Sequence, residues 1–122
     1  EDYLEMIYRM TESRPAVGVN EVAAKLHVRP SSASKMIGKL KEASLISFEK
    51  YGQITLTEQG RDRGRYFLWR HEVLSRFFRR LNRSEGELRQ VELIEHFLNE
   101  ETVGNLEKLL ERFPADWEEL GS

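Results

Sequence analysis

The order of local sequence patterns between residues 20 and 81 constrains the fold of this chain more than any other feature. Residues 20–43 predict a helix, a short turn and a second helix. Asn20 is a favourable N-cap for the first helix, and Ser31 or Ser32 can cap the second. The run His27-Val28-Arg29-Pro30 interrupts the apolar periodicity between them. Two helices joined by so short a turn form a helix-turn-helix unit.

Two strand-like segments follow this unit. Residues 45–49 and 54–56 are rich in β-branched and aromatic side chains, and Gly52 lies in the turn between them. Thr57 is a favourable N-cap for a long helix that runs to about residue 81. A hairpin directly after the second helix is a wing, so these segments together predict a winged helix-turn-helix.

Further helical patterns lie on both sides of the winged unit. Apolar residues at helical spacing predict a helix over residues 1–12. Ser84 and Glu87 have the spacing of a capping box that opens a helix through Leu98, and Thr102 opens a last helix that Pro114 stops. The sequence therefore predicts a mainly α protein. Residues 1–70 form an N-terminal winged helix-turn-helix DNA-binding domain, and residues 71–122 form a C-terminal helical dimerisation and metal-binding domain.

Composition fits a globular protein of the cytoplasm. The 122 residues are enough to bury a core without disulfides. The sequence contains no Cys, which argues against zinc fingers and thiol redox chemistry and fits a reducing compartment. No apolar run approaches the roughly 18 residues that cross a bilayer, and no signal peptide is visible. We therefore expect cytoplasmic localisation and no membrane partner.

Charge is distributed unevenly along the chain. Residues 1–70 contain 12 Lys and Arg against 9 Asp and Glu, whereas residues 71–122 contain 7 against 12. The basic excess is largest over residues 25–65, with 9 against 4. A mildly basic front half suits a polyanion, and an acidic back half suits cations.

The second helix of the helix-turn-helix carries side chains expected at a DNA surface. Hydroxyl groups in its first turn can approach base edges or phosphates, and a helix N-terminus itself attracts phosphate. Lysines farther along, and residues at the wing tip, can contact phosphates. The alternative is that these lysines are only a solvated helix face, but the order of elements favours double-stranded DNA as the partner. The candidate DNA-binding residues are Arg29, Pro30, Ser31, Ser32, Ser34, Lys35, Lys39, Lys41, Lys50 and Tyr51.

Six potential metal ligands lie in three separate segments. Carboxylates and imidazoles suit Mn²⁺, Fe²⁺ or Zn²⁺, whereas soft metals prefer thiolates. Three of the six have the i, i+3, i+4 spacing that shares one face of a helix. The alternatives are that the two acids near the start complement a helix dipole, and that His96 is an ordinary core or surface histidine. The six residues are Asp2, Glu5, His71, Glu92, Glu95 and His96.

Five segments of the chain resemble the manganese-responsive branch of the diphtheria-toxin-repressor family. The resemblance covers essentially the whole chain, and the segments follow the family's order. They are Glu1-Asp2-Tyr3-Leu4-Glu5, Arg29-Pro30-Ser31-Ser32-Ala33-Ser34-Lys35-Met36, Leu56-Thr57-Glu58-Gln59-Gly60, Trp69-Arg70-His71-Glu72 and Glu92-Leu93-Ile94-Glu95-His96.

The resemblance implies a metal-activated repressor of metal-uptake genes that acts as a homodimer on a palindromic operator. It implies that all six candidate residues are ligands of Mn(II), with room for a binuclear site, and Fe(II), Zn(II), Cd(II) or Co(II) are also compatible. The iron-responsive branch typically has Met in place of Asp2 and Cys in place of Glu92. The sequence also lacks the SH3-like third domain of the longer iron-type members, and this favours the short manganese type.

The back half has a surplus of large apolar residues, which predicts a dimer interface. The alternative is that they form an internal core. The residues expected to take part are Trp69, Phe77, Phe78, Leu106, Leu109, Leu110 and Phe113.

Three alternative functions were weighed against the sequence, and each differs from a Mn(II)-activated repressor in a feature that can be tested. An Fe(II)- or Zn(II)-responsive member of the same family would differ in the activating metal. A winged-helix regulator of a small organic ligand would bind DNA equally with and without Mn²⁺. A di-metal carboxylate enzyme usually draws its ligands from four helices, and no nucleophile triad, phosphate loop or HExxH motif is present. We therefore expect no enzymatic activity.

Overall fold

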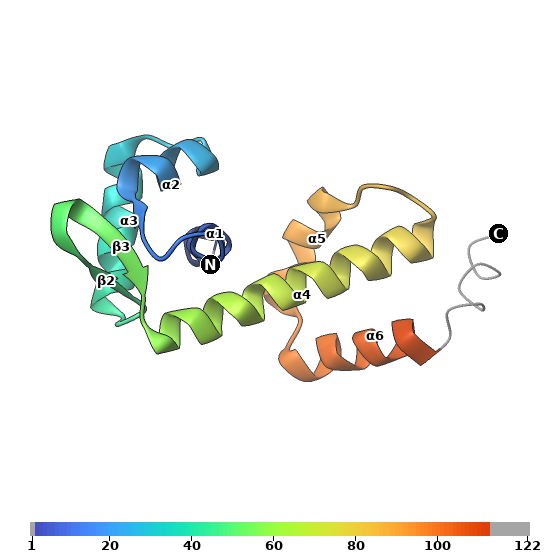
Figure 1. Cartoon of the computed structure of the whole chain (residues 1–122). Helices are drawn as coiled ribbons and strands as arrows, with labels where there is room; N and C mark the ends of the chain where they lie inside the picture. Colours follow the sequence, from blue (N-terminus) through green and yellow to red (C-terminus); the bar gives the residue numbers. More distant parts are fainter. Residues whose placement is uncertain (1, 113–122) are drawn as a thin grey trace. The chain divides into compact units, whose positions relative to one another are not determined.

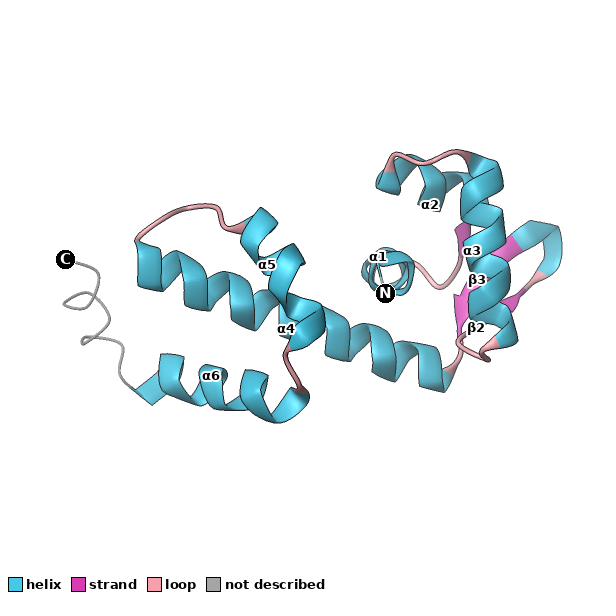
Figure 2. Ribbon diagram, turned by 180° about the vertical axis from the view of Figure 1, so that it is seen from behind, coloured by secondary structure: helices cyan, strands magenta, loops and turns pink. Residues whose placement is uncertain are grey.

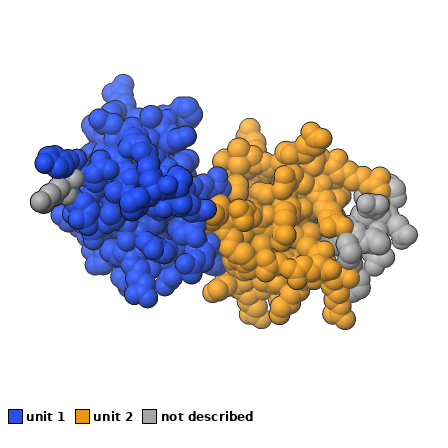
Figure 3. All heavy atoms as spheres, viewed as in Figure 1, with its two compact units in different colours: residues 1–67 blue, residues 68–122 orange. Residues whose placement is uncertain are grey.

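The computed structural model describes residues 2–112, apart from the side chain of Lys50. The chain divides into two compact units, residues 1–67 and 68–122, which Figure 3 distinguishes by colour. The division falls inside one long helix, α4 (Glu58–Asn82), which contributes to both units. Each unit has its own core and is described separately.

Unit 1 is a winged helix-turn-helix, as predicted. Its helices are α1 (Asp2–Thr11), α2 (Val19–Leu26), α3 (Pro30–Glu42) and the first part of α4 (Figure 1). A small antiparallel sheet contains β1 (Val17–Gly18), β2 (Ile46–Phe48) and β3 (Gln53–Leu56) in the order β1-β3-β2. These strands, magenta in Figure 2, are short, and a 3-10 turn, η1 (Lys50–Gly52), joins β2 to β3.

Strand β1 is the one element of the sheet that sequence patterns did not predict. It pairs with β3 on the side opposite to β2, with Val17 beside Ile54 and Gly18 beside Gln53. Two residues are too short to show the alternation by which strands are recognised. The strand anchors the segment between α1 and α2 to the wing.

The core of unit 1 explains why these elements pack together. Helix α1 has a strongly amphipathic pattern and buries one stripe at helical spacing. The helix-turn-helix and the hairpin close over this stripe, and each β-branched core residue of the hairpin lies on the inward face of its strand. The buried apolar residues are Leu4, Ile7, Met10, Val17, Val22, Ala23, Ala33, Ile37, Ile46, Ile54, Leu56 and Phe67.

The helix starts in the helix-turn-helix differ from those predicted. Helix α2 begins at Val19, so Asn20 lies inside it, and the carboxylate of Glu21 accepts a hydrogen bond from the backbone N–H of Gly18 at 3.2 Å. Helix α3 begins at Pro30, with Arg29 as N-cap and no side-chain cap. Proline fits the first helical position because its missing N–H has no intrahelical partner there. The predictions of Asn20, Ser31 or Ser32 as N-caps were therefore wrong.

The start of α4 confirms the predicted cap. The hydroxyl of Thr57 accepts a hydrogen bond from the backbone N–H of Gly60 at 3.0 Å and donates one to the carbonyl of Ser44 at 2.7 Å. The helix ends at Asn82, one residue beyond the prediction. Near its start, a hydrogen bond from the Arg65 guanidinium to Tyr8 raises the pKa of Arg65, and this contact joins α4 to α1.

Up to residue 112, unit 2 adds two α-helices to the second part of α4. They are α5 (Leu88–Ile94) and α6 (Glu100–Arg112), separated by a 3-10 turn, η2 (Glu95–Phe97). The predicted single helix through Leu98 was wrong, because the α-helix ends at Ile94.

The predicted caps of these helices also differ from the structure. Ser84 does not cap α5; its hydroxyl donates instead to the carboxylate of Glu87 at 2.6 Å, and the side-chain amide of Asn82 donates to the same oxygen at 3.0 Å. These two bonds lower the pKa of Glu87. The cap of α6 is Asn99, whose side-chain oxygen accepts from the backbone N–H of Thr102 at 2.8 Å.

Four of the apolar residues expected at a dimer interface lie in the core of unit 2 or pack against it. Leu110 is only 6% exposed and packs with Val73 and Val103. Trp69, Phe77 and Leu106 pack against the same cluster, whereas Phe113 lies outside the described residues. Large apolar side chains that are exposed in unit 2 are Leu88, Leu93, Phe97 and Leu109. Among residues 2–112, no helix combines the length and apolar character needed to cross a bilayer.

Candidate metal centre and nucleic-acid interface

Helix α3 separates an apolar inner face from a polar outer face. Ala33 and Ile37 are buried in the core of unit 1. The candidate DNA-binding residues of this helix and its N-cap are all exposed; they are Arg29, Pro30, Ser31, Ser32, Ser34, Lys35, Lys39 and Lys41. Because the helix has no side-chain cap, its first N–H groups remain available to an anion.

Lys41 has a partner within unit 1 that the sequence reading missed. Its ammonium lies 5.1 Å from the centre of the Phe48 ring, within the range of a cation–π contact. Lys41 is at the end of α3 and Phe48 is at the end of β2, so this contact joins the helix to the wing. Lys41 therefore has a role in positioning the wing that is independent of any phosphate contact.

The tip of the wing presents an exposed aromatic side chain. Tyr51 is 97% exposed and has a φ of 63°, and the next residue, Gly52, has a φ of 70°. A left-handed backbone is unfavourable for an aromatic residue, at roughly 1–2 kcal/mol. Among the described side chains, none packs on its exposed ring closely enough to offset this cost. The side chain of Lys50, also predicted at this tip, lies outside the described part of the chain.

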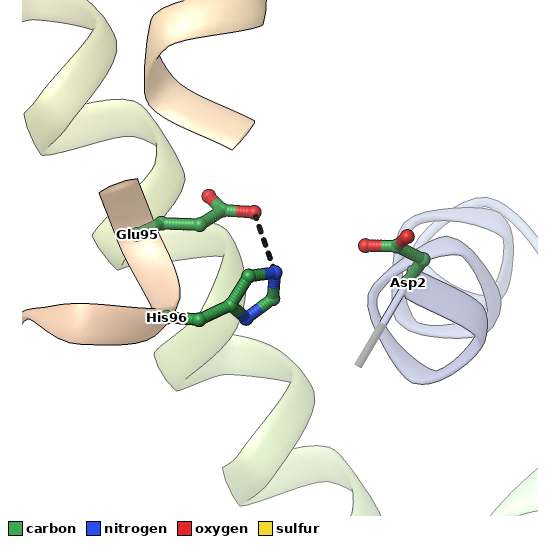
Figure 4. Close-up of side chains that lie close together, drawn as sticks. All are labelled: Asp2, Glu95 and His96. Atoms are coloured by element: carbon green, nitrogen blue, oxygen red, sulfur yellow. Dashed lines mark ion pairs between the residues drawn. The ribbon is translucent and has the colours of Figure 1, made fainter. Parts of the chain in front are cut away.

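Unit 2 brings three of the six candidate metal ligands together. His71 lies on α4, and Glu95 and His96 lie on η2. One carboxylate oxygen of Glu95 is 3.3 Å from His71 Nδ1, and the other is 4.0 Å from His96 Nε2. Glu95 is only 5% exposed, so its carboxylate is removed from solvent between two imidazoles. Figure 4 shows the Glu95–His96 pair as a dashed line.

Glu92 is placed differently from Glu95. It is exposed on α5, and it makes no hydrogen bond or ion pair with residues 2–112. The predicted i, i+3, i+4 face assumed one continuous α-helix, but η2 changes the helical geometry between Glu92 and the other two residues. Glu92 is exposed where Glu95 is buried, and the shared role of these three donors in one metal site stays a prediction.

Asp2 and Glu5 lie in the first turn of α1, in unit 1. Asp2 is exposed, and Figure 4 shows its carboxylate at the start of this helix. Glu5 forms an ion pair with Arg9 at 3.0 Å, four residues farther along α1. The sequence reading missed this pair, although the i, i+4 spacing of opposite charges was visible. A metal ion would therefore have to compete with Arg9 for the Glu5 carboxylate.

A second polar contact fixes the helix that carries His71. The indole N–H of Trp69 donates to Glu107 Oε2 at 2.9 Å, and Arg76 Nη2 lies 3.7 Å from the same oxygen. Glu107 is on α6, so one carboxylate binds α4 to α6 at two residues that lie about two helical turns apart. Trp69 and Arg76 lie on either side of His71 in the sequence, so their contacts with Glu107 restrain the helical segment that carries the His71 ring.

Comparison with known protein families also divides the chain into two successive parts. Residues 1–54 match the family model described as iron dependent repressor, N-terminal DNA binding domain. Residues 57–118 match the model described as iron dependent repressor, metal binding and dimerisation domain. Together the two models cover nearly the whole chain.

Individual relatives agree with the family models. The HTH-type transcriptional regulator MntR of Geobacillus kaustophilus is 38% identical over 117 residues, which are 95% of this chain and 83% of MntR. The solved structure of the metal-dependent transcriptional regulator MtsR has a TM-score of 0.80 at 28% identity, covering 90% of this chain and 52% of MtsR. The manganese regulator SloR has a TM-score of 0.79 at 27% identity, covering 90% of this chain and 52% of SloR. The chain thus spans about half the length of these two solved structures. By both family models and this identity to MntR, the chain belongs to the iron-dependent repressor family, which confirms the resemblance seen in its sequence.

Proposed function

We propose that this protein is a Mn(II)-activated transcriptional repressor of metal-uptake genes that binds a palindromic operator as a cytoplasmic homodimer. The observation that carries the proposal is the presence in one chain of an exposed helix-turn-helix surface and, in the other unit, a buried carboxylate between two imidazoles. A metal-controlled regulator combines these two features, because its donor set binds the cation that controls its DNA-binding surface.

The DNA-binding surface is proposed to be the outer face of α3 together with the wing. Ser31, Ser32 and Ser34 are small enough to let α3 enter the major groove, where base edges are read. Lys35 and Lys39 supply charge for phosphates on either side. Tyr51 at the wing tip reaches toward the neighbouring backbone or minor groove.

The metal site is proposed to comprise Asp2, Glu5, His71, Glu92, Glu95 and His96. The buried carboxylate of Glu95 is the feature of this set that suits a bound cation. An ionised carboxylate that is removed from water needs a compensating charge. Glu92, exposed and without a partner among residues 2–112, has a carboxylate available for the same ion. Six donors are enough for two ions, so a binuclear site is part of the proposal.

Mn(II) is proposed as the physiological activator. Four carboxylates and two imidazoles are hard and borderline donors, which suit Mn(II) and Fe(II), and the set contains no thiolate or thioether. SloR, which shares this fold, is described as a manganese regulator. Zn(II), Cd(II), Co(II) and Fe(II) remain compatible with the same donors, since preference among them depends on geometry and supply.

Control of DNA binding is proposed to depend on charge between the two units. A bound divalent cation supplies positive charge to a set that contains four carboxylates. Without compensation, Asp2 and Glu5 on α1 repel Glu92 and Glu95, because like charges disfavour a common site. With compensation, the six side chains restrict the movement of the DNA-binding unit, so that less ordering remains to be done when DNA binds.

The homodimer surface is proposed to lie on α5 and η2. Leu88, Leu93 and Phe97 are large apolar residues, and Phe97 is 83% exposed. Three such side chains on one short segment mark a protein interface, because single chains rarely expose contiguous apolar patches. A dimer places two α3 helices about 34 Å apart when its operator half-sites are one DNA turn apart.

Two measurements test the proposed function. Duplex affinity is measured in parallel with Mn(II), Fe(II), Zn(II) and Cd(II), using a duplex selected from a randomised pool, and the tightest binding is expected with Mn(II). Silent His71→Ala and Glu95→Ala variants would favour a regulator of an organic ligand. Sedimentation equilibrium at micromolar concentration is expected to give a dimer, and Phe97→Asp is expected to give monomers. A wild-type monomer would contradict the dimer.

A further inference from the structure

Gly38 lies in the interior of α3, and no contact within the described residues requires a glycine there. Its φ does not lie in the left-handed region, and a Cβ built on Gly38 would have no heavy atom of these residues within 4 Å apart from its chain neighbours and the adjacent backbone of its own helix. Glycine in a helix interior is destabilising relative to alanine, because it loses more backbone freedom on folding. The chain therefore carries a conformational cost at this position that its own packing does not explain.

Two other helical glycines show one structural reason for such a residue in this protein. Both are in α4, where another segment of unit 1 approaches the helix backbone. A Cβ on Gly60 would overlap the carbonyl oxygen of Leu45, and a Cβ on Gly64 would lie 2.7 Å from the Cβ of Tyr8. At both positions a close neighbour occupies the space that a side chain would need. At Gly38 the corresponding space is open.

The position of Gly38 on α3 identifies the neighbour that would fill this space. It lies seven residues after Ser31, four after Ser34 and three after Lys35, a spacing that shares one helix face. These three side chains are exposed, whereas the next residue before Gly38, Ile37, is buried in the core. Gly38 therefore extends the exposed serine and lysine face by a further turn.

We propose that the floor of the DNA major groove approaches the backbone of α3 at Gly38, and that the absent side chain sets how deeply this helix enters the groove. The inference rests on the proposed DNA-binding function. A methyl group at this position would hold the helix away from the base edges and lengthen the contacts of Ser34 and Lys35 with them. Phosphate contacts by flexible lysines would adjust more readily, so sequence-specific binding should suffer more than non-specific binding.

Gly38→Ala and Gly38→Ser separate this role from helix stability. Alanine raises helix propensity, whereas serine is a poorer helix former of similar size. Gly104→Ala is the matched control, because Gly104 is also inside a helix, α6, and a Cβ there would meet only Trp69 Cη2 at an ordinary 4.0 Å. Both alanine variants should raise the Tm by about 2–8 °C.

The affinity measurement uses the full chain with Mn(II), a fluorescent duplex selected by the wild-type protein from a randomised pool, and an unrelated duplex of the same length. Gly38→Ala and Gly38→Ser should each raise the Kd for the selected duplex by roughly tenfold or more, comparable with the effect of one wrong base pair. The Kd for the unrelated duplex should change less. Gly104→Ala should leave both values unchanged.

The outcomes distinguish this inference from the function on which it rests. If the wild-type protein binds no duplex, the proposed function fails and the inference fails with it. If the wild-type protein binds, and Gly38→Ala gains stability but keeps the wild-type Kd, only the inference is overturned. Loss of affinity in the alanine variant with full affinity in the serine variant would also overturn it, because size would then not be the cause.

Discussion

Replacing Glu95 with Gln should remove most of the stabilisation that Mn(II) gives to the folded protein. Glu95 is the buried member of the candidate set, with carboxylate oxygens 3.3 Å from His71 Nδ1 and 4.0 Å from His96 Nε2. Glutamine has the same shape and can still form a hydrogen bond with His71, so the variant should fold. It lacks the negative charge by which a buried oxygen attracts a divalent cation.

The size of the effect follows from ligand linkage. A ligand present at one hundred times its Kd stabilises the folded state by about 2.7 kcal/mol. Changes next to metal ligands alone weaken metal affinity by roughly 10–100-fold, so loss of the buried ligand itself should weaken it by at least about 100-fold. At the same Mn(II) concentration the stabilisation then falls to about 0.4 kcal/mol. The difference corresponds to roughly 9 °C in Tm for a domain of this size.

Thermal unfolding in matched Mn(II) and chelator buffers measures this difference. Wild-type protein should show a large rise in Tm with Mn(II), and Glu95→Gln should show almost none. Glu101→Gln, an exposed glutamate at the start of α6, is the matched control and should keep the wild-type rise. Glu92→Gln should fall between the two, because Glu92 is exposed. A full rise in Glu95→Gln would refute the assignment of the buried carboxylate as a ligand.

The remaining predictions concern DNA binding and pH. Lys35→Ala should reduce the slope of log affinity against log salt by about 0.9, as expected for one lost phosphate contact, in a salt titration of duplex binding; an unchanged slope would mean that the lysine is only solvated. Tyr51→Asn should stabilise the folded protein by about 1 kcal/mol in chemical denaturation, because Asn tolerates a left-handed backbone, yet it should weaken duplex binding; a gain in both would exclude a role for the ring on DNA. The pKa of Glu87 is lowered by hydrogen bonds from Ser84 and Asn82, so this group contributes stability above the unfolded carboxyl pKa and loses it as pH falls through the folded pKa. Glu87→Gln should therefore be less stable than wild type at pH 7, and the gap in Tm should close as pH falls below about 4, where an unfolded Glu carboxyl becomes protonated; a gap that persists in acid would contradict this reading.

The winged helix-turn-helix was predictable because each of its elements has a strong local signal. The apolar stripe of α1, the turn signal of Gly52 and the cap of Thr57 all specify structure within a few residues. Strand β1 had no such signal, since Val17 and Gly18 become a strand only through pairing with β3. A pairing partner far along the chain cannot be deduced from two residues.

Errors at helix starts have a common physical cause. Asn20, Ser31 and Thr102 are all residues that favour an N-cap, but a favourable cap is a preference that neighbouring residues can override. Pro30 fits the first position of α3 because it lacks an N–H, and it therefore displaces the cap to Arg29. Asn99 supplies the cap of α6 three residues before Thr102.

The candidate metal residues were chosen by donor type and spacing, and these features do not specify burial. The sequence could not show that Glu95 is buried while Glu92 is exposed, because the burial of a side chain depends on tertiary packing. It likewise could not separate core from surface among the apolar residues of the back half. Leu110 and Leu88 have similar character, yet Leu110 is core and Leu88 is exposed.

Metal binding and DNA binding are proposed to be coupled, and a comparison of duplex affinity in Mn(II) and in chelator measures this coupling. The measurement uses one selected duplex at fixed ionic strength, with wild-type protein and Glu95→Gln. Mn(II) is expected to lower the Kd of the wild-type protein about 5–150-fold, the usual range of coupling between two sites, whereas Glu95→Gln should show little change. Equal wild-type Kd values in Mn(II) and chelator would contradict it.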